Sequence, residues 1–250
     1  MKKLAVIILT YNEEKNIEEC IKSASFADEV VVVDSGSTDN TVAMAEGLGA
    51  KVHIHPFENF AAQRNVGLEQ TDADWIFYLD ADERISQEAA KDICRATEEN
   101  RQAFYDIKRV NIVFGQRMKY GGHGPDYPQR LYPRGHVKWE GVVHEGAITD
   151  LPLDHLKGEL EHYTYTDWDR YFIKFNQYTT LMAKKMQDKG KKASFWSMAS
   201  HSFFSFIRFY ILQGGFLEGK LGFIFAMNHF FYTMIKYVKL EHMQEQDKKS

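Results

Sequence analysis

The stretch from Trp75 to Leu79 most constrains the fold, because it holds five apolar or aromatic residues and no charge. Such an unbroken run is typical of a strand buried on both faces of a parallel sheet. The run ends at three carboxylates, Asp80, Asp82 and Glu83. Ligands of open α/β sheets bind at the carboxyl ends of the strands. The sequence therefore predicts a central strand that delivers acidic side chains to a ligand site.

Crowded carboxylates repel one another, so folding alone gives little reason to place them together. A divalent cation that bridges to phosphate oxygens would neutralise them, since hard cations take oxygen ligands. If the backbone stays extended, alternation points the side chains of Asp80 and Asp82 the same way. The alternative is a solvated turn, in which Ser86 caps the next helix and the acids interact with its dipole. The position after a buried strand favours the cation site over that alternative.

The first hundred residues alternate between predicted strands and predicted helices. The expected strands are Lys3–Leu9, Glu29–Val33, Lys51–His55 and Trp75–Leu79. Helices follow each of them, and the first helix has an apolar face at Ile17, Cys20, Ile21 and Ala24. This alternation predicts an α/β fold with a Rossmann-like, mostly parallel sheet and flanking helices. The apolar start ends at Leu9 without a small-residue cleavage site, which predicts a strand and not a secretion signal.

The pattern changes after residue 100. The stretch 104–114 is predicted as a long antiparallel strand, and short strands are expected at 129–132, 137–139 and 159–163. The segment from Tyr120 to Pro128 is rich in glycine and proline and is a candidate lid. We therefore expect a catalytic domain over residues 1–163 and a helical region over residues 164–250.

The helical region is aromatic and basic. Helices are expected from residue 167 onward, with two further ones over 195–213 and 221–239 separated by Gly214 and Gly215. Neither reaches the ~20 uninterrupted apolar residues that a membrane span needs. Aromatic residues mixed with Lys and Arg are typical of helices that lie on a membrane surface. A homodimer or domain interface is the alternative for the same stripe.

The charge is divided unequally along the chain. Residues 1–162 carry 18 Lys and Arg against 28 Asp and Glu, whereas residues 163–250 carry 13 against 7. An acidic body without a basic stripe argues against nucleic-acid binding. The basic end indicates an anionic surface as partner. The two cysteines, Cys20 and Cys94, match no metal or redox spacing and are expected to be reduced thiols of a cytoplasmic protein.

Three segments together resemble the family-2 glycosyltransferases of GT-A fold. They are Leu9-Thr10-Tyr11-Asn12-Glu13, the stretch 33–41 (Val-Asp-Ser-Gly-Ser-Thr-Asp-Asn-Thr) and Tyr78-Leu79-Asp80-Ala81-Asp82-Glu83. The resemblance covers about the first 145 residues. Three later segments are similar to those of small bacterial β-1,4-glucosyltransferases of the lipopolysaccharide inner core. These are Arg130-Leu131-Tyr132-Pro133-Arg134, His144-Glu145 and Gly215-Phe216-Leu217-Glu218-Gly219.

The resemblance implies inverting transfer of a hexose, with UDP-glucose as the expected donor. The residues it assigns to the nucleotide sugar are Thr10, Tyr11, Glu13, Asp34, Ser35, Arg64 and Asp80. Tyr11 is expected to stack on the uracil ring. Ser35 stands where many members of the family carry a second acid, so recognition of the base departs from the usual pattern.

The resemblance also implies a divalent cation, Mg²⁺ or Mn²⁺, held by Asp80 and Asp82 with His144 as a further ligand. Asp82 is expected to be the more direct of the two carboxylate ligands, and the cation would act as Lewis acid for the leaving nucleotide. Arg64, together with Arg130 or Arg134, is a candidate for gripping the diphosphate.

Inversion requires a general base that deprotonates the acceptor hydroxyl. Glu145 is the expected base, and Asp126 and Glu140 are its rivals. Together with Asp82 it forms the predicted catalytic pair.

The expected acceptor is a lipid-linked glycan, a heptose of the lipopolysaccharide or lipooligosaccharide inner core. That acceptor implies a cytoplasmic enzyme, peripheral on the inner face of the cytoplasmic membrane. Polyprenyl phosphate, another polysaccharide or a peptide is an alternative acceptor, because loops determine acceptor choice. A scaffold that binds nucleotide sugar or membrane without catalysis is an alternative of a different class.

Overall fold

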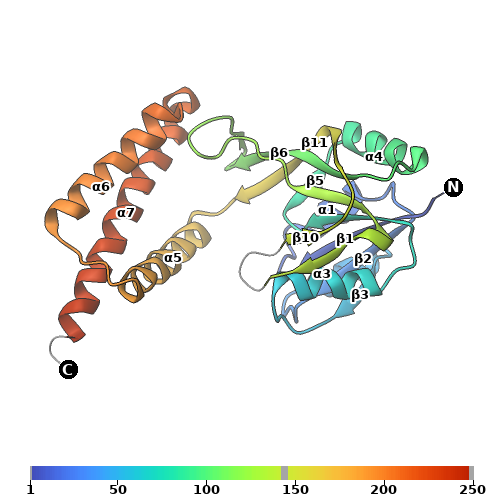
Figure 1. Cartoon of the computed structure of the whole chain (residues 1–250), viewed down its shortest axis with the longest axis horizontal. Coiled ribbons are helices and arrows are strands. Elements are labelled where there is room, and N and C mark those ends of the chain that lie inside the picture. Colours follow the sequence, from blue (N-terminus) through green and yellow to red (C-terminus); the bar gives the residue numbers. More distant parts are fainter. Residues whose placement is uncertain (1, 142–145, 248–250) are drawn as a thin grey trace. The chain divides into compact units, whose positions relative to one another are not determined.

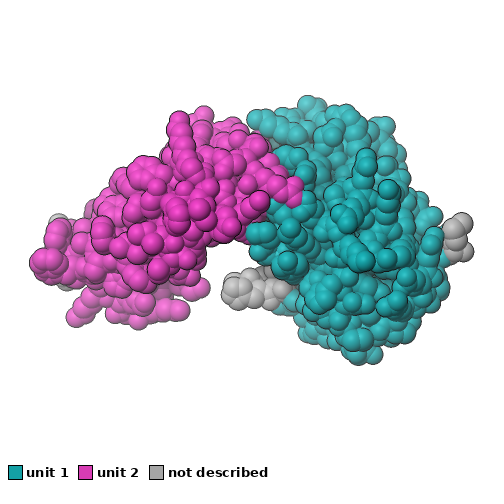
Figure 2. All heavy atoms as spheres, turned by 90° about the horizontal axis from the view of Figure 1, so that it is seen from above, with its two compact units in different colours: residues 1–110, 125–164 teal, residues 111–124, 165–250 magenta. Residues whose placement is uncertain are grey.

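The computed structural model describes residues 2–141 and 146–247. The chain divides into two compact units, which Figure 2 colours separately. Unit 1 comprises residues 1–110 and 125–164, and unit 2 comprises residues 111–124 and 165–250. The sequence suggested a single boundary after residue 163 and did not anticipate that residues 111–124 belong to the second unit.

Unit 1 begins with the predicted parallel sheet (Figure 1). Its strands are β1 (Leu4–Thr10), β2 (Glu29–Asp34), β3 (Lys51–Ile54) and β4 (Trp75–Asp80). They run in the order β3-β2-β1-β4 and all three pairings are parallel. In the register, Leu9 pairs with Asp80 and Thr10 pairs with Asp34. The polar residues that follow the strands are thereby brought to one edge of the sheet.

Helices cover both faces of these strands. They are α1 (Ile17–Ser23), α2 (Thr41–Gly47), α3 (Phe60–Glu69) and α4 (Gln87–Glu99). Side-chain caps define two of the starts: Asn59 accepts a hydrogen bond from the Ala62 amide, and Ser86 accepts one from the Ala89 amide. The predicted cap at Ser86 is confirmed. Helix α4 ends at Asn100, whose left-handed conformation is typical of a helix C-terminus.

Antiparallel strands extend the sheet beyond β4. They are β5 (Glu83–Ile85), β6 (Phe104–Val113), β7 (Gln116–Arg117), β8 (Gln129–Pro133) and β11 (Leu153–Tyr165). The order continues β4-β8-β6-β11-β5, with β7 paired to β6. The predicted antiparallel strand at 104–114 is confirmed. A 3₁₀ turn, Arg134–His136, leads to a separate ladder of β9 (Lys138–Glu140) and β10 (Gly146–Ile148). The result is a mixed α/β fold whose parallel half is the one that the sequence predicted.

The core of unit 1 follows the alternation of the central strands. Phe77 and Leu79 of β4 belong to one buried cluster, which includes side chains of α1, α2 and α4. Ile76 and Tyr78 belong to a second cluster, which includes Ala61 of α3. Every residue from Trp75 to Leu79 is at most 1% exposed. The predicted burial of this strand on both faces is confirmed.

Unit 2 is mostly helical. Its elements are α5 (Trp168–Asp188), α6 (Phe195–Ile207), a π-helical turn η2 (Arg208–Leu212), a 3₁₀ turn η3 (Gly215–Glu218) and α7 (Gly219–Asp247). The predicted helices are confirmed, although the expected helix over 195–213 becomes π-helical at Arg208. Within the described residues, no helix has the length and apolar character needed to cross a membrane.

Candidate active site

A pocket of about 720 Å³ opens at the carboxyl ends of β1, β2 and β4, within unit 1. Its polar lining residues are Thr10, Tyr11, Glu13, Ser35, Gln63, Arg64, Asp80, Asp82 and His162. Its apolar lining residues are Leu9, Phe57, Phe60 and Ala81. Seven of the residues predicted for the site, from four separate segments of the chain, therefore lie in this pocket.

The Asp80 carboxylate lies between two arginines. Arg130 donates from Nη2 to Oδ2 at 2.7 Å, and Arg64 donates from Nη2 to Oδ1 at 3.3 Å. Burial raises the pKa of Asp80, but Arg130 and Arg64 outweigh that effect and hold its pKa well below the usual range. Asp80 is therefore ionised at neutral pH.

Glu83 is directed into the protein and away from the pocket. It is fully buried, and it accepts hydrogen bonds from Arg130 Nη2 at 2.6 Å and from Arg109 Nη1 at 3.0 Å. The Asp80 amide donates to the second carboxylate oxygen at 3.1 Å. Of the three acids after β4, Glu83 is thus the counter-ion that holds the arginines in place. Residues 81 and 82 form a turn and not the extended backbone assumed above, yet Asp82 still lines the pocket beside Asp80.

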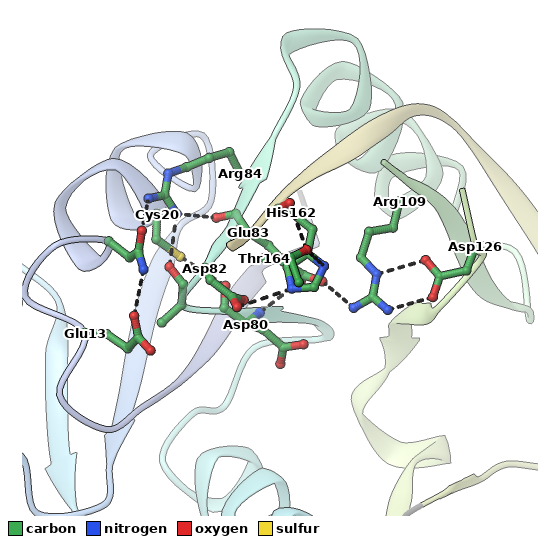
Figure 3. A network of polar contacts seen from close by, with 12 residues as sticks. Glu13, Cys20, Asp80, Asp82, Glu83, Arg84, Arg109, Asp126, His162 and Thr164 are labelled. Carbon is green, nitrogen blue, oxygen red and sulfur yellow. Dashed lines mark hydrogen bonds and ion pairs between the residues drawn. The ribbon is translucent and has the colours of Figure 1, made fainter. Parts of the chain in front are cut away.

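Asp82 makes its side-chain contact with a histidine that the sequence did not point to. His162 of β11 lies with Nε2 3.2 Å from Asp82 Oδ2, as Figure 3 shows. The Tyr163 amide also donates to the Asp82 carbonyl at 2.9 Å, which fixes the turn against β11. The side chain of Asp82 is 34% exposed. Some 80 residues separate the pair, and only the antiparallel pairing of β11 with β5 brings them together.

The pocket offers part of a cation site. Among residues 2–141 and 146–247, no three His, Cys, Asp or Glu side chains converge in a way that would hold a metal ion. Asp80 and Asp82 nevertheless present hard carboxylate oxygens on one wall. Mg²⁺ in proteins is commonly held by one or two carboxylates together with substrate phosphates and water. The residues present fit a cation of that kind, and the predicted ligand His144 lies outside the described residues.

Three aromatic rings also line the pocket. Tyr11 is 59% exposed, and Phe57 and Phe60 are each 52% exposed with ring centroids 5.1 Å apart. Half-exposed rings beside polar groups suit the face of a nucleobase. The sequence pointed to Tyr11 but not to the two phenylalanines, since nothing near residue 57 indicated a site.

Asp34 has a different position from the one predicted. It is fully buried and outside the pocket lining. Its carboxylate accepts hydrogen bonds from Thr10 Oγ1 at 2.8 Å and from the Gly36 and Ser37 amides at 2.9 and 2.7 Å. Asp34 therefore shapes the loop that carries Ser35. The Ser35 hydroxyl lines the pocket and accepts from Gln63 Nε2 at 2.8 Å.

The three candidate arginines, Arg64 of α3, Arg130 of β8 and Arg134 of the 3₁₀ turn after β8, have different positions relative to the pocket. Arg64 lines the pocket and lies under the Trp139 ring, with its guanidinium carbon 4.6 Å from the ring centroid. Arg130 reaches Asp80 but is itself 3% exposed. Arg134 lies at the other end of β4, where its amide donates to the Asp74 carbonyl. Because β8 is antiparallel to β4, Arg134 is excluded from this pocket.

Comparison with known proteins decides the family. The sequence model described as "Glycosyl transferase family 2" matches residues 5–148, more than half of the chain. The chain belongs to glycosyltransferase family 2. This confirms the resemblance and shows that the protein is a glycosyltransferase.

Two curated relatives align with nearly the whole glycosyltransferase. An uncharacterized glycosyltransferase of Rickettsia typhi is 28% identical, over 97% of this chain and 88% of the relative. The lipopolysaccharide core biosynthesis glycosyltransferase LpsC of Rhizobium meliloti is 29% identical, over 95% of this chain and 91% of the relative. The solved structure of Staphylococcus aureus TarS has 20% identity and a TM-score of 0.45, over 74% of this chain and 39% of its own. That structural likeness is too distant to argue from.

The candidate bases of the glycosyltransferase differ in their surroundings. Asp126 forms a two-pronged ion pair with Arg109, at 2.9 Å from Nε and 2.6 Å from Nη2 (Figure 3). Glu140 is paired with Lys138 at 2.9 Å. Neither residue lines the pocket. The favoured candidate, Glu145, lies outside the described residues and stays a prediction.

Proposed function

We propose that this glycosyltransferase transfers a hexose, with inversion, from a UDP-sugar to a lipid-linked glycan, using Mg²⁺ or Mn²⁺. The observation that carries the proposal is a single pocket lined both by Asp80 and Asp82 and by Tyr11 and the phenylalanine pair. Acids and aromatic rings in one pocket suit the phosphates and the base of a nucleotide diphosphate. Glucose is the proposed sugar, and it rests on the resemblance to inner-core glucosyltransferases.

In this proposal different residues of the pocket bind different parts of the donor. Tyr11 stacks on the base, while Thr10, Glu13 and Ser35 offer polar groups to the nucleoside. Arg64 faces the diphosphate and can donate two parallel hydrogen bonds to it. Asp80 and Asp82 hold the cation, and His162 orients Asp82 through the 3.2 Å contact. When bound, the cation would withdraw charge from the leaving diphosphate.

The acceptor step requires a base on the opposite side of the sugar. We propose Glu145, which would take the proton of the acceptor hydroxyl while its oxygen attacks the anomeric carbon and the bond to the diphosphate breaks. The ion pairs of Asp126 and Glu140 support this choice, because a carboxylate held by Arg or Lys is less available as a base.

For the acceptor we propose a heptose of the lipopolysaccharide or lipooligosaccharide inner core. The similarity to LpsC, a lipopolysaccharide core biosynthesis glycosyltransferase, supports it, as do the segments at 130–134 and 215–219. A lipid-linked acceptor of this kind places the proposed site of action at the cytoplasmic face of the inner membrane. Polyprenyl phosphate, another polysaccharide or a peptide is the alternative acceptor within the same chemistry.

The test is UDP release by the purified full chain, from a panel of UDP-sugars with Mn²⁺, with and without chelator. We expect slow hydrolysis of one sugar that chelator abolishes and that Asp82→Ala loses. The matched control is Asp72→Ala, since Asp72 is a fully exposed acid outside the pocket. If turnover requires acceptor, no UDP is released, and calorimetry with UDP and Mn²⁺ then measures binding of the nucleotide instead. Absence of both release and binding would rule out the proposed donor. UDP release retained in Asp82→Ala would contradict the role given to Asp82, and UDP binding without release in the presence of acceptor would favour the scaffold.

A further inference from the structure

The outward face of α6 is apolar and aromatic. Trp196, Phe203 and Phe204 are 78%, 61% and 59% exposed. Spacings of seven and eight residues place them on one side of the helix. The same surface continues through η2 and η3, where Leu212 and Leu217 are 69% and 58% exposed. A water-soluble helix normally directs such residues toward the core.

The inward face of α6 carries small hydroxyl residues instead. Ser202 is fully buried, and its hydroxyl donates to the Met198 carbonyl at 2.7 Å. The Ser205 hydroxyl donates across to the His229 carbonyl of α7 at 3.3 Å. Large residues outside and small polar residues between helices are the arrangement of helices packed in lipid.

Glycines continue this close packing at the start of α7. A Cβ added to Gly222 would lie 1.8 Å from the Gly215 carbonyl oxygen, so only glycine fits there. Gly215 and Gly222 therefore let η3 and α7 approach backbone to backbone, as small residues do between membrane helices. Unit 2 also buries large apolar side chains, such as Phe225 and Leu240 of α7, so the exposed aromatic residues of α6 are additional to its core.

The segment that carries this face is basic. From residue 189 to 220 the chain has five Lys or Arg and one acid, Glu218. Glu218 is buried and accepts hydrogen bonds from the Lys119 and Tyr120 amides at 2.6 and 2.8 Å. Within residues 189–220 no carboxylate is therefore exposed, while Lys191 and Lys220 are exposed near the two ends. Exposed acids lie outside this segment, at Asp188 and at Glu241, Glu245 and Asp247 of α7.

We propose that the outward face of α6, η2 and η3 inserts into the interface of a bilayer that contains anionic lipid. The aromatic side chains would enter the headgroup and acyl boundary, and the lysines would meet lipid phosphates. A second copy of the chain is a poorer occupant, because a twofold interface would set this basic segment, which has no exposed carboxylate of its own, against itself.

This inference rests on the proposed function, which acts at the inner membrane, and it specifies the surface of the chain that binds that membrane. The experiments below contain neither donor nor acceptor. The membrane surface can therefore be refuted while the proposed glycosyl transfer is confirmed, and the transfer can be refuted while the membrane surface is confirmed.

The first experiment is flotation of the full chain with vesicles of phosphatidylcholine alone, or of phosphatidylcholine and phosphatidylglycerol in equal parts. We expect binding to the anionic vesicles that weakens in about 1 M salt, where screening acts over ~3 Å. Phe203→Ser combined with Phe204→Ser should lower the partition coefficient by about tenfold or more, since two large apolar groups no longer enter the bilayer. Leu181→Ser, an equally exposed site on α5, is the matched control and should bind as the parent does.

The second experiment locates Trp196 in the bilayer. Trp75 and Trp139 are buried and Trp168 is 36% exposed, so the experiment uses a Trp168→Phe background, in which a lipid carrying bromine on its acyl chains should quench mainly the exposed Trp196. We expect quenching that Trp196→Phe removes while flotation persists. Failure to float on anionic vesicles at low salt would overturn the proposal. So would flotation that the double serine variant retains, or a dimer in solution that this variant dissociates, which would assign the face to a second copy.

Discussion

A single nitrogen of Arg130, Nη2, lies 2.7 Å from Oδ2 of Asp80 and 2.6 Å from Oε1 of Glu83. Arg130 and Glu83 are 3% and 0% exposed. One buried cation therefore joins the pocket carboxylate to an acid in the interior. This contact explains how a cluster of acids is tolerated at the end of the central strand.

Arg130→Met should destabilise unit 1 by about 3–5 kcal/mol, because it leaves the Glu83 carboxylate buried with less compensation. Urea unfolding of the full chain measures this. Arg134→Met is the matched control on the same segment, since its ion pair with Asp72 is long, at 3.8 Å, and exposed. The control should change stability by no more than about 0.5 kcal/mol. Equal effects of the two substitutions would contradict the role given to Arg130.

His162→Ala should raise the Mn²⁺ concentration that gives half-maximal UDP release by about 10–100-fold, because residues that orient a metal ligand typically contribute that much. His155→Ala is the control on the same strand: His155 is exposed and contacts Asp106, which lies outside the pocket. Titration of activity with Mn²⁺ distinguishes the two variants. An unchanged titration in His162→Ala would mean that its contact with Asp82 is structural only.

Tyr11→Ala should weaken UDP binding by about tenfold or more, since stacking of a base on an aromatic ring contributes about 1–3 kcal/mol. Tyr11→Phe should bind nearly as the parent does. Tyr127→Ala serves as the control, because Tyr127 is similarly exposed, at 61%, and does not line the pocket. Calorimetry gives the three dissociation constants. Full affinity in Tyr11→Ala would place the base elsewhere, with Phe57 and Phe60 as the next rings to test.

The stability of unit 2 should fall as the pH falls from about 6.5 to about 4. Burial lowers the pKa of His229 to about 4, with nearby His123 and Arg208 acting in the same direction. The unfolded chain then binds a proton that the folded chain resists, so acid favours unfolding by up to ~3 kcal/mol. His229→Phe can keep the stack on Phe209, whose ring centroid is 3.5 Å away, without titrating. Thermal unfolding against pH should be flatter in this variant, and identical pH profiles would refute the assignment.

Gly67→Ala should destabilise unit 1 by about 1–3 kcal/mol. The added Cβ would lie 2.5 Å from Ile7 Cγ2 and would push α3 away from β1. Because α3 also carries Gln63 and Arg64, UDP affinity should fall as well. Gly47→Ala, also in a helix but with nothing within 4 Å of its Cβ, should stabilise slightly. Circular dichroism melting separates the two, and a neutral Gly67→Ala would mean that the contact relaxes at little cost.

Local pattern predicted the parallel half of the fold. Unbroken apolar runs, alternating helices and a serine cap at residue 86 each depend on neighbouring residues only, so the sequence by itself determined β1 to β4 and the helices between them. Since parallel strands align their carboxyl ends, this also determined that Thr10, Tyr11, Ser35, Asp80 and Asp82 share one pocket.

Tertiary structure decided what the antiparallel strands contribute. Arg130 reaches the pocket carboxylate and Arg134 does not because of the register of β8 on β4, and His162 meets Asp82 because of the register of β11 on β5. These registers join residues 50 to 80 positions apart, and a shift by one residue would turn each side chain to the other face. No local pattern encodes that choice. Packing of the whole sheet therefore made Glu83 a buried counter-ion and Asp34 a loop anchor, while the sequence had placed both among the acids at the strand ends.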